Sequence, residues 1–396
     1  MIITNTSTEL MESADIGLDI GGSLCKIAVF VPEGKPESDS VLQVLLSLST
    51  GQEFKLSDQL VIPNLGVVHF ASFPSSQISS VSKTHPPINL HQPSSSLHAT
   101  GGGAHKFEAD LLKLTNCKRV EHIGEIQALF DGLEFLLRVG EADEIFICSE
   151  VRFAGMVGNE RQRLKTQPLY PTLSTRPRDK QSEGFLVVNI GSGVSFVDCD
   201  GRGSYTRVGG SSLGGATFHG LVTLLCGVNN FDEALSLASQ GDSTKVDLLV
   251  GDIYSHGPET NKKLEDLGLR PSTLAASFGK MANSELARKM VKKSDLALAC
   301  LIMVALNVAA MAHLHAVAKS RRVVLFVGSF LGSNANRRNT LACRTLTYGI
   351  EFWGEMRGIP MKAAFLKREG FLGALGALAR NQKHTFHALF QKNASL

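Results

Sequence analysis

The stretch that decides the fold, residues 16–31, reads Ile-Gly-Leu-Asp-Ile-Gly-Gly-Ser-Leu-Cys-Lys-Ile-Ala-Val-Phe-Val. Two apolar runs flank the turn Gly21-Gly22-Ser23, and the second run is rich in β-branched residues. This pattern predicts a β-hairpin, because glycine supplies the backbone freedom that a tight turn between two strands needs.

A second copy of the pattern begins roughly half a chain later. Residues 185–190 enter the turn Gly191-Ser192-Gly193, and residues 194–198 leave it. The duplication predicts two related α/β domains, each offering a phosphate-sized glycine turn to one ligand in a cleft between them.

The seam between the domains is predicted in the basic, proline-bearing segment 161–183, which is typical of a surface loop. We therefore expect domains over 1–182 and 183–396. The serine-rich stretch 74–96 holds several prolines and has no helical or strand period, so it is predicted as a loop or partly disordered excursion. Helices are expected over 104–113, 123–138, 216–225, 295–319 and 370–378, with a strand over 323–327.

Composition indicates a globular chain of two or three packed domains. It has 396 residues and a mass of 42.6 kDa, with 43% hydrophobic and 19% charged residues. A net charge of +3 is too balanced for a protein that neutralises a polyphosphate backbone, so no nucleic-acid partner is expected. The seven cysteines are scattered singly, which predicts reduced, mostly buried thiols rather than a disulfide framework or a zinc site. Because no secretion or import signal precedes Lys26, we expect a cytoplasmic protein.

The longest apolar run, 296–312, invites comparison with a membrane span. Asn307 interrupts it, and Asp295 and His313 bound it, so the unbroken run is shorter than the ~18 residues that a span requires. We predict a buried helix with Ser294 as its N-cap, and no membrane partner.

The glycine turns matter for chemistry because a backbone without Cβ approaches a phosphate closely and points its N–H groups at the oxygens. The first hairpin contains neither the Walker P-loop nor the Rossmann fingerprint, which disfavours both common nucleotide folds. A lone glycine turn is most often only a hairpin, but Asp19 and Asn189 precede the glycines of the two copies. An aspartate there is suited to hold Mg²⁺ or its water shell. Lys26 is either an exposed strand lysine or a phosphate contact.

Two further charged residues are candidates for catalysis. Glu125 begins a helix of core-forming residues, where a carboxylate serves either a reaction or the helix dipole. Arg207 precedes the glycine-rich loop 209–215, and a guanidinium beside such a loop suits a transferring phosphoryl group. Taken alone, an arginine at this place is more often a surface residue, so both alternatives stay open for each position.

At these positions the chain resembles the eukaryotic-type (type II) pantothenate kinases, of the superfamily of acetate and sugar kinases, actin and heat-shock ATPases. The resemblance spans nearly the whole chain. It departs at Ser23, where the family usually has Thr, and at Ser329, which replaces a usual Asn. The matching motifs, in chain order, are Asp19-Ile20-Gly21-Gly22-Ser23-Leu24-x-Lys26, His69-Phe70, Ala99-Thr100-Gly101-Gly102-Gly103-Ala104, Val188-Asn189-Ile190-Gly191-Ser192-Gly193-Val194-Ser195, Arg207-Val208, Ser212-Leu213-Gly214-Gly215, Gly241-Asp242-Ser243-Thr244, Ala275-Ala276-Ser277-Phe278-Gly279-Lys280, Val327-Gly328 and Glu369-Gly370-Phe371.

The resemblance implies two ribonuclease-H-like domains of the actin and sugar-kinase type with an interdomain nucleotide cleft. It also implies a homodimeric enzyme that uses ATP and Mg²⁺ to convert pantothenate to 4'-phosphopantothenate, the first step of coenzyme A biosynthesis, with acyl-coenzyme A as feedback inhibitor. Carried over by position, Glu125 is the general base and Arg207 stabilises the phosphoryl group. Arg207 and the serines Ser192 and Ser195 then bind substrate or acyl-coenzyme A. The ATP- or phosphate-binding residues are Asp19, which also holds Mg²⁺, Gly21, Gly22, Ser23, Lys26, Gly191, Ser192, Gly193, Gly214, Gly215 and Gly328.

Two alternatives remain beside this interpretation. Another small-molecule hydroxyl kinase of the superfamily, for example one acting on an amino sugar, would share the ATP elements and differ in the acceptor pocket. A non-catalytic member would bind ATP or acyl-coenzyme A and signal by shape. The joint presence of Asp19, Glu125 and Arg207 argues against the second alternative.

Overall fold

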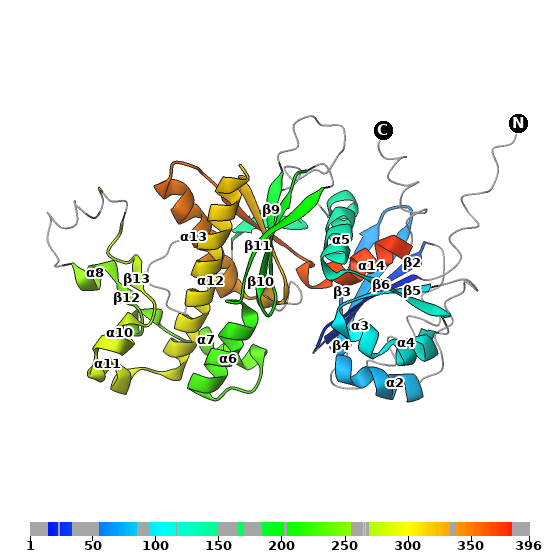
Figure 1. The fold of residues 1–396 in the computed structure, drawn as a ribbon, viewed down its shortest axis with the longest axis horizontal. Coiled ribbons are helices and arrows are strands. Elements are labelled where there is room, and N and C mark those ends of the chain that lie inside the picture. Colours follow the sequence, from blue (N-terminus) through cyan, green and yellow to red (C-terminus); the bar gives the residue numbers. More distant parts are fainter. Residues whose placement is uncertain are drawn as a thin grey trace, which may run out of the picture. The chain divides into compact units, whose positions relative to one another are not determined.

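The computed structural model divides the chain into two compact units, whose elements are labelled in Figure 1. Unit 1 comprises residues 1–141 and 370–396, and unit 2 comprises residues 142–369. The residues that the structure describes are 15–22, 24–33, 55–84, 96–115, 117–141, 143–148, 165–169, 184–201, 204–254, 264, 266, 269–332 and 338–381.

Unit 1 is built on a six-stranded sheet of order β3-β4-β2-β1-β5-β6. The predicted hairpin is its centre, with β1 antiparallel to β2, and β1, β5 and β6 run parallel. The strands are β1 (Asp15–Ile20), β2 (Leu24–Pro32), β3 (Lys55–Ile62), β4 (Gly66–Pro74), β5 (Ser96–Thr100) and β6 (Arg119–Ile123).

Helices cover both faces of this sheet, because successive residues of β1 point to opposite sides. Ile16, Leu18 and Ile20 pack in one core with Leu111 and Leu114 of α4. Gly17 faces the other side, where α14 lies against β1 (Figure 1). The helices of unit 1 are η2 (Ser75–Gln77), α2 (Ile78–Thr84), α3 (Gly102–Lys106), α4 (Glu108–Thr115), α5 (Glu125–Val139) and α14 (Leu372–Asn381), the last preceded by η6 (Glu369–Phe371).

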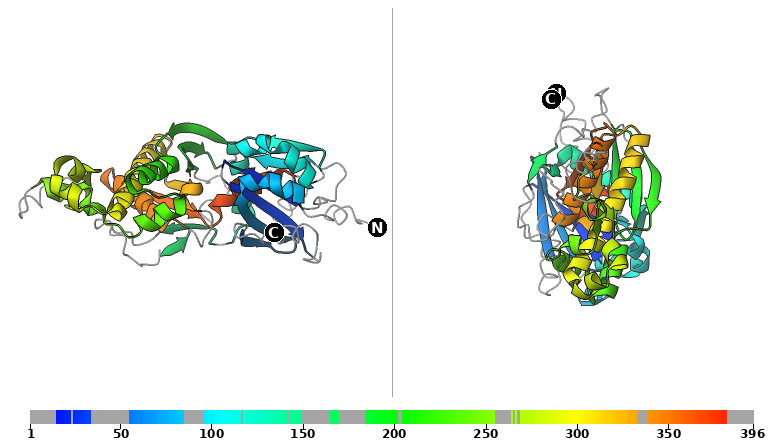
Figure 2. Two further views of the ribbon diagram at one scale, coloured as in Figure 1. Left: turned by 90° about the horizontal axis from the view of Figure 1, so that it is seen from below. Right: turned by 90° about the vertical axis from the view of Figure 1, so that its left-hand side faces the viewer.

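The C-terminal helix, α14, belongs to unit 1 because it packs on α5 through close backbone contact. A Cβ added to Gly376 would lie 1.8 Å from the Ala128 carbonyl oxygen of α5, and one on Gly132 would lie 2.1 Å from that of Leu372. Glycine at both places lets α5 and α14 approach without overlap. In the left view of Figure 2, the orange-red C-terminal segment lies beside blue and cyan elements of unit 1.

Unit 2 carries a seven-stranded sheet of order β11-β10-β9-β14-β15-β7-β8. The second predicted hairpin is the antiparallel pair β9–β10, and β14 runs parallel to both β9 and β15. The strands are β7 (Ile145–Cys148), β8 (Thr166–Pro168), β9 (Phe185–Ile190), β10 (Val194–Cys199), β11 (Tyr205–Ser211), β14 (Val323–Val327) and β15 (Lys362–Leu366), with β12 (Leu248–Leu249) and β13 (Leu274–Ala276) in a separate pair. The helices are α6 (Gly215–Cys226), α7 (Phe231–Ala238), η3 (Ser243–Lys245), α8 (Val250–Ile253), α10 (Gly279–Asn283), α11 (Glu285–Met290), α12 (Lys293–Ala318), η4 (Ser329–Leu331) and α13 (Thr340–Met356).

The two sheets share one topology. In unit 1 the order β4-β2-β1-β5-β6, and in unit 2 the order β11-β10-β9-β14-β15, is an antiparallel three-strand meander followed by two parallel strands. This is the ribonuclease-H-like arrangement, with β3 added at one edge in unit 1 and β7–β8 at the other edge in unit 2. The prediction of two related ribonuclease-H-like α/β domains is therefore confirmed.

Helix α12 forms the centre of unit 2. It has 26 residues, an apolar window of mean hydropathy 2.1, and 67% of that window is buried. Among the described residues it is the one helix long and apolar enough to cross a membrane, and it packs on α6, α7 and α13. The predicted buried helix is confirmed, but Ser294 is not its cap. The helix begins at Lys293, two residues before the predicted start, and Lys292 is its N-cap. The Asp295 carboxylate accepts hydrogen bonds from the amides of Lys292 (3.2 Å) and Asp242 (2.8 Å).

Three other predictions need correction or refinement. The stretch predicted as a loop contains α2, whose Ser79 and Ser82 donate hydrogen bonds to Asp110 of α4 at 2.6 and 2.8 Å. The helix expected over 104–113 is two helices that meet at Phe107. The units divide at 141/142 rather than 182/183, because α14 packs on α5 and β7 joins the sheet of unit 2.

All seven cysteines lie among the described residues, are buried and form no disulfide.

Gly101→Ala is expected to destabilise unit 1. Gly101 has φ +85°, and a Cβ there would lie 2.4 Å from the Ile20 carbonyl oxygen. Backbone strain and overpacking each cost about 1–3 kcal/mol, so thermal or denaturant unfolding is expected to show a loss of more than about 2 kcal/mol. Gly102→Ala is the matched control, because its Cβ would meet nothing within 4 Å. Equal stability of the two variants would contradict this account of the turn.

Candidate functional site

Three loops of unit 1 meet at the carboxyl edge of its parallel strands. Asp19 of β1 is in register with Thr100 of β5, which is in register with Ile123 of β6. Gly21, Gly101 and Gly124 therefore begin neighbouring loops, and this edge is where α/β sheets bind ligands. With strands about 4.8 Å apart, the start of α5 lies about 10 Å from the end of β1.

The Asp19 carboxylate is enclosed by two glycines at this edge. A Cβ on Gly101 would lie 3.1 Å from Oδ1, and one on Gly373 of α14 would lie 2.8 Å from Oδ2. The side chain is 22% exposed, and Lys26 Nζ, on the neighbouring strand, lies 3.9 Å from Oδ2. Burial raises the pKa of Asp19, and the Lys26 charge opposes that rise. No described residue donates a hydrogen bond to the carboxylate, so its oxygens keep the acceptor capacity that a hydrated Mg²⁺ requires.

The first glycine turn is anchored by η2, which directly follows β4. The Gly21 amide donates to the Leu24 carbonyl at 2.9 Å, and Ser75 Oγ donates to the Gly21 carbonyl at 2.8 Å. Gly22 is exposed, and a Cβ there would meet nothing within 4 Å. Ser23, also predicted to bind phosphate, lies outside the described residues.

Glu125 is the first residue of α5 and is exposed. It comes two residues after Ile123, so the topology brings it to the same sheet edge as Asp19. None of the described residues forms an ion pair or hydrogen bond with its carboxylate. A carboxylate placed in this way is available to accept a proton from a ligand at the edge.

The second glycine turn lies under the start of α6. The Gly215 amide donates to the Gly191 carbonyl at 2.8 Å, and the Ala216 amide donates to the Ser192 carbonyl at 3.1 Å. A Cβ on Gly214 would lie only 2.6 Å from the Ser192 carbonyl oxygen. Gly214 and Gly215 therefore serve first to let α6 pack on the turn.

The turn amides divide into two groups. Those of Gly21, Gly191, Gly214 and Gly215 already donate within the protein. Those of Gly22, Ser192 and Gly193 have no acceptor among the described residues. The second group is the part of the predicted phosphate-binding set whose N–H groups are available to an anion.

Arg207 and Ser195 lie together on the β10–β11 pair. Ser195 is opposite Gly210 in the register, so the two face the same side of the sheet. A Cβ on Gly210 would lie 2.8 Å from Arg207 Nη2, and Arg207 Nε donates to the Gly209 carbonyl at 3.4 Å. The exposed guanidinium thus extends over Gly210 toward Ser195, and it has no carboxylate partner among the described residues.

Asn189 is a residue that the predicted binding set missed. Gly328, after β14, has φ +110°, and a Cβ there would lie 2.5 Å from Asn189 Oδ1 and 2.5 Å from the Ile190 carbonyl oxygen. In unit 1, Gly101 has the same relation to Asp19 and Ile20. Asn189 is thus the counterpart of Asp19, and its place two residues before Gly191 of the second turn was the available signal.

Sequence comparisons with known proteins agree on one family. Residues 15–380 match the Fumble family. The chain is 31% identical to "Pantothenate kinase 2" of Arabidopsis thaliana over 97% of its own length, but spans only 40% of that protein. It is 32% identical to "Pantothenate kinase" of Schizosaccharomyces pombe, covering 92% of this chain and 81% of that protein. A solved glucokinase from Balamuthia mandrillaris in complex with glucose aligns with 93% of this chain and 94% of its own, at 13% identity and a TM-score of 0.43.

Asp19→Asn is expected to raise the unfolding midpoint at about pH 7. The pKa of Asp19 in the folded protein lies above its ordinary value of 3.8. Ionisation of its carboxylate therefore lowers the free energy of unfolding as the pH rises through the folded pKa. Asparagine stays neutral, so the gain should vanish below pH 3.8. Thermal unfolding followed across pH measures this, and a variant less stable than wild type at neutral pH would show that the Lys26 contact outweighs burial.

Proposed function

Because the chain belongs to the Fumble family of type II pantothenate kinases, we propose that it transfers the γ-phosphoryl group of ATP to the terminal hydroxyl of pantothenate. The observation that carries the proposal is the repeated site geometry. In each unit a glycine turn with at least one available amide lies beside an Asp or Asn enclosed by a positive-φ glycine. Each of these turns suits a phosphate group.

The phosphates are bound, in this proposal, by backbone amides and two cationic side chains. The amides of Gly22, Ser192 and Gly193 donate to phosphate oxygens, and Lys26 and Arg207 balance the charge. This division follows from the hydrogen bonds above, since an amide that already donates within the fold has no hydrogen left for a ligand.

Asp19 is the residue suited to hold Mg²⁺. Its oxygens accept no hydrogen bond from described residues, and its partial exposure leaves room for water between carboxylate and metal. Mg²⁺ prefers one or two carboxylates together with phosphate oxygens and retained water. When bound, the metal would neutralise charge on the triphosphate.

The chemical step needs a base and a group that stabilises charge. The pantothenate hydroxyl oxygen forms a bond to the γ-phosphorus, the bond from that phosphorus to the β–γ bridging oxygen breaks, and ADP leaves. The hydroxyl proton passes to the Glu125 carboxylate, and Arg207 stabilises the negative charge of the phosphoryl oxygens. Exposure and the lack of a described partner support Glu125 in this role.

The direct test is phosphorylation of labelled pantothenate by the purified chain with ATP and Mg²⁺. A parallel panel contains glucose and N-acetylglucosamine at the same concentrations. Formation of labelled 4'-phosphopantothenate, without comparable sugar phosphorylation, is expected. Sugar phosphorylation alone would assign the chain to another hydroxyl kinase, and ATP binding without any transfer would assign it a non-catalytic role.

Gly22→Val is expected to abolish ATP binding in a protein that stays folded. The added side chain has open space in the free protein, so the native structure tolerates it. The same space is where a phosphate oxygen would approach the turn. Calorimetric titration with ATP, alongside circular dichroism, measures both effects. Unchanged ATP affinity in the variant would remove this turn from the nucleotide site.

Glu125→Gln is expected to lower kcat by about 10²–10⁴-fold while ATP affinity stays normal, because Gln keeps the size and loses the basic oxygen. Glu134→Gln is the matched control, since Glu134 is an exposed carboxylate on the same helix that pairs with Arg138. The control should retain wild-type kcat. More than about a tenth of wild-type kcat in Glu125→Gln would make Glu125 a helix-start carboxylate.

Acyl-coenzyme A is proposed as an inhibitor that competes with ATP, because its phosphates would use the same turn amides and Arg207. Acetyl-coenzyme A should therefore raise the apparent KM for ATP. An unchanged KM at every inhibitor concentration would contradict this part of the proposal. We also propose that the chain forms a homodimer, as the sequence resemblance implies, and sedimentation of the purified chain measures this.

A further inference from the structure

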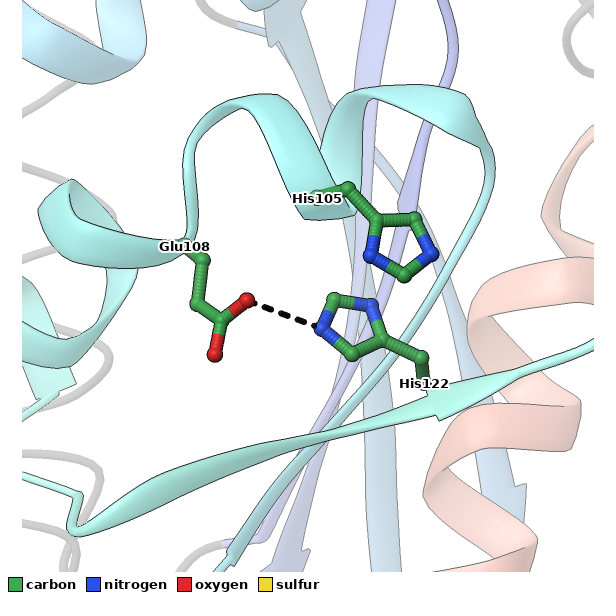
Figure 3. A group of neighbouring side chains, drawn as sticks. All are labelled: His105, Glu108 and His122. Atoms are coloured by element: carbon green, nitrogen blue, oxygen red, sulfur yellow. Dashed lines mark hydrogen bonds and ion pairs between the residues drawn. The ribbon is translucent and has the colours of Figure 1, made fainter.

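A cluster of two histidines and one glutamate lies at the same sheet edge and has no part in the proposed reaction. His105 belongs to α3, Glu108 begins α4, and His122 lies on β6 (Figure 3). Their donor atoms all lie within 4.8 Å of one another. Among the described residues they are the only group of three or more His, Cys, Asp or Glu side chains with this proximity.

The geometry approaches that of a metal site. Glu108 Oε2 lies 3.1 Å from His122 Nε2. Ligand atoms about 2.0–2.2 Å from a tetrahedral zinc lie about 3.4 Å apart, so this pair already has the required spacing. The His105 ring stacks on that of His122, with centroids 3.7 Å apart and planes 8° apart (Figure 3). His105 is exposed, and one of its ring nitrogens lies within 4.8 Å of the donor atoms of Glu108 and His122.

An ordinary ion pair explains only part of the cluster. Glu108 and His122 alone would form an exposed pair worth about 0–1 kcal/mol. The second imidazole gains no hydrogen bond from that pair, and no described residue bonds to it. Two imidazoles and one carboxylate are, in contrast, the ligand set that borderline divalent ions such as Zn²⁺ favour over Mg²⁺.

We propose that His105, Glu108 and His122 bind a divalent transition-metal ion of the Zn²⁺ class, with a remaining coordination position open to solvent. The ion would join β6 to the segment that follows Gly101–Gly103. Gly101 and Gly103 themselves lie against Ile20, and β6 leads to Glu125. The bound metal would therefore fix two loops of the edge relative to each other, and the proposal stands whether or not the chain phosphorylates pantothenate.

Metal binding to the full chain tests this directly. Chelator-treated protein is titrated with Zn²⁺ by calorimetry in excess Mg²⁺, and Co²⁺ replaces Zn²⁺ for visible absorption. Wild type should bind one ion through these residues, show a tetrahedral Co²⁺ spectrum, and gain thermal stability with Zn²⁺. His105→Ala, Glu108→Gln and His122→Ala should each lose at least about 10-fold in affinity and lose the Zn²⁺-dependent stabilisation.

Matched controls keep the test specific. Glu121→Gln alters the neighbour of His122 on β6, and His219→Ala removes a histidine of α6 in unit 2. Both should bind Zn²⁺ as wild type does. The three ligand variants should unfold at the wild-type temperature without metal, because they alter side chains at the surface. No saturable Zn²⁺ binding by wild type, or equal affinity in the ligand variants, would overturn the proposal.

Discussion

The fold of each unit depends on one close backbone contact. The glycine that follows the strand parallel to the hairpin, β5 in unit 1 and β14 in unit 2, lies against the last residue of the hairpin's first strand. Gly101 contacts Ile20 in unit 1, and Gly328 contacts Ile190 in unit 2, each with a φ that side chains rarely adopt. A Cβ at either place would lie about 2.5 Å or less from a carbonyl oxygen. In the turns that follow Ile20 and Ile190, the amides of Gly22, Ser192 and Gly193 have no acceptor among the described residues.

The two copies of this arrangement carry different charges. One row across the sheet of unit 1 places Asp19 opposite Lys26, and the equivalent row of unit 2 places Asn189 opposite Ser195. Unit 1 therefore supplies the carboxylate suited to a metal, together with Glu125. Unit 2 supplies neutral hydrogen-bonding groups and Arg207. Burial raises the pKa of Asp19, so the fold places an ionisable group where its charged form is disfavoured, as ligand sites often do.

Sequence patterns predicted the elements whose signals are local. Both hairpins, α5, α12, β14 and the terminal helix follow from apolar periodicity and glycine turns. Helix α2 was missed because its support is tertiary, through serines bonded to Asp110 some 28 to 31 residues away. The same holds for Asp295, whose capping carboxylate also binds the Asp242 amide. For the site, the residue types could be predicted from the sequence. Only the three-dimensional structure shows which glycine amides already donate hydrogen bonds within the protein.

The central claim, which rests on the proposed function, is that the available amides of each glycine turn bind phosphate oxygens of the nucleotide. Amide hydrogen exchange, resolved by NMR with and without Mg²⁺ and a non-hydrolysable ATP analogue, measures this most directly. The account predicts strong slowing at Gly22, Ser192 and Gly193, and little change at Gly191 and Gly215, which already donate within the protein. Protection confined to the turn of one unit, or no protection at Gly22 and Gly193 under saturating analogue, would contradict it.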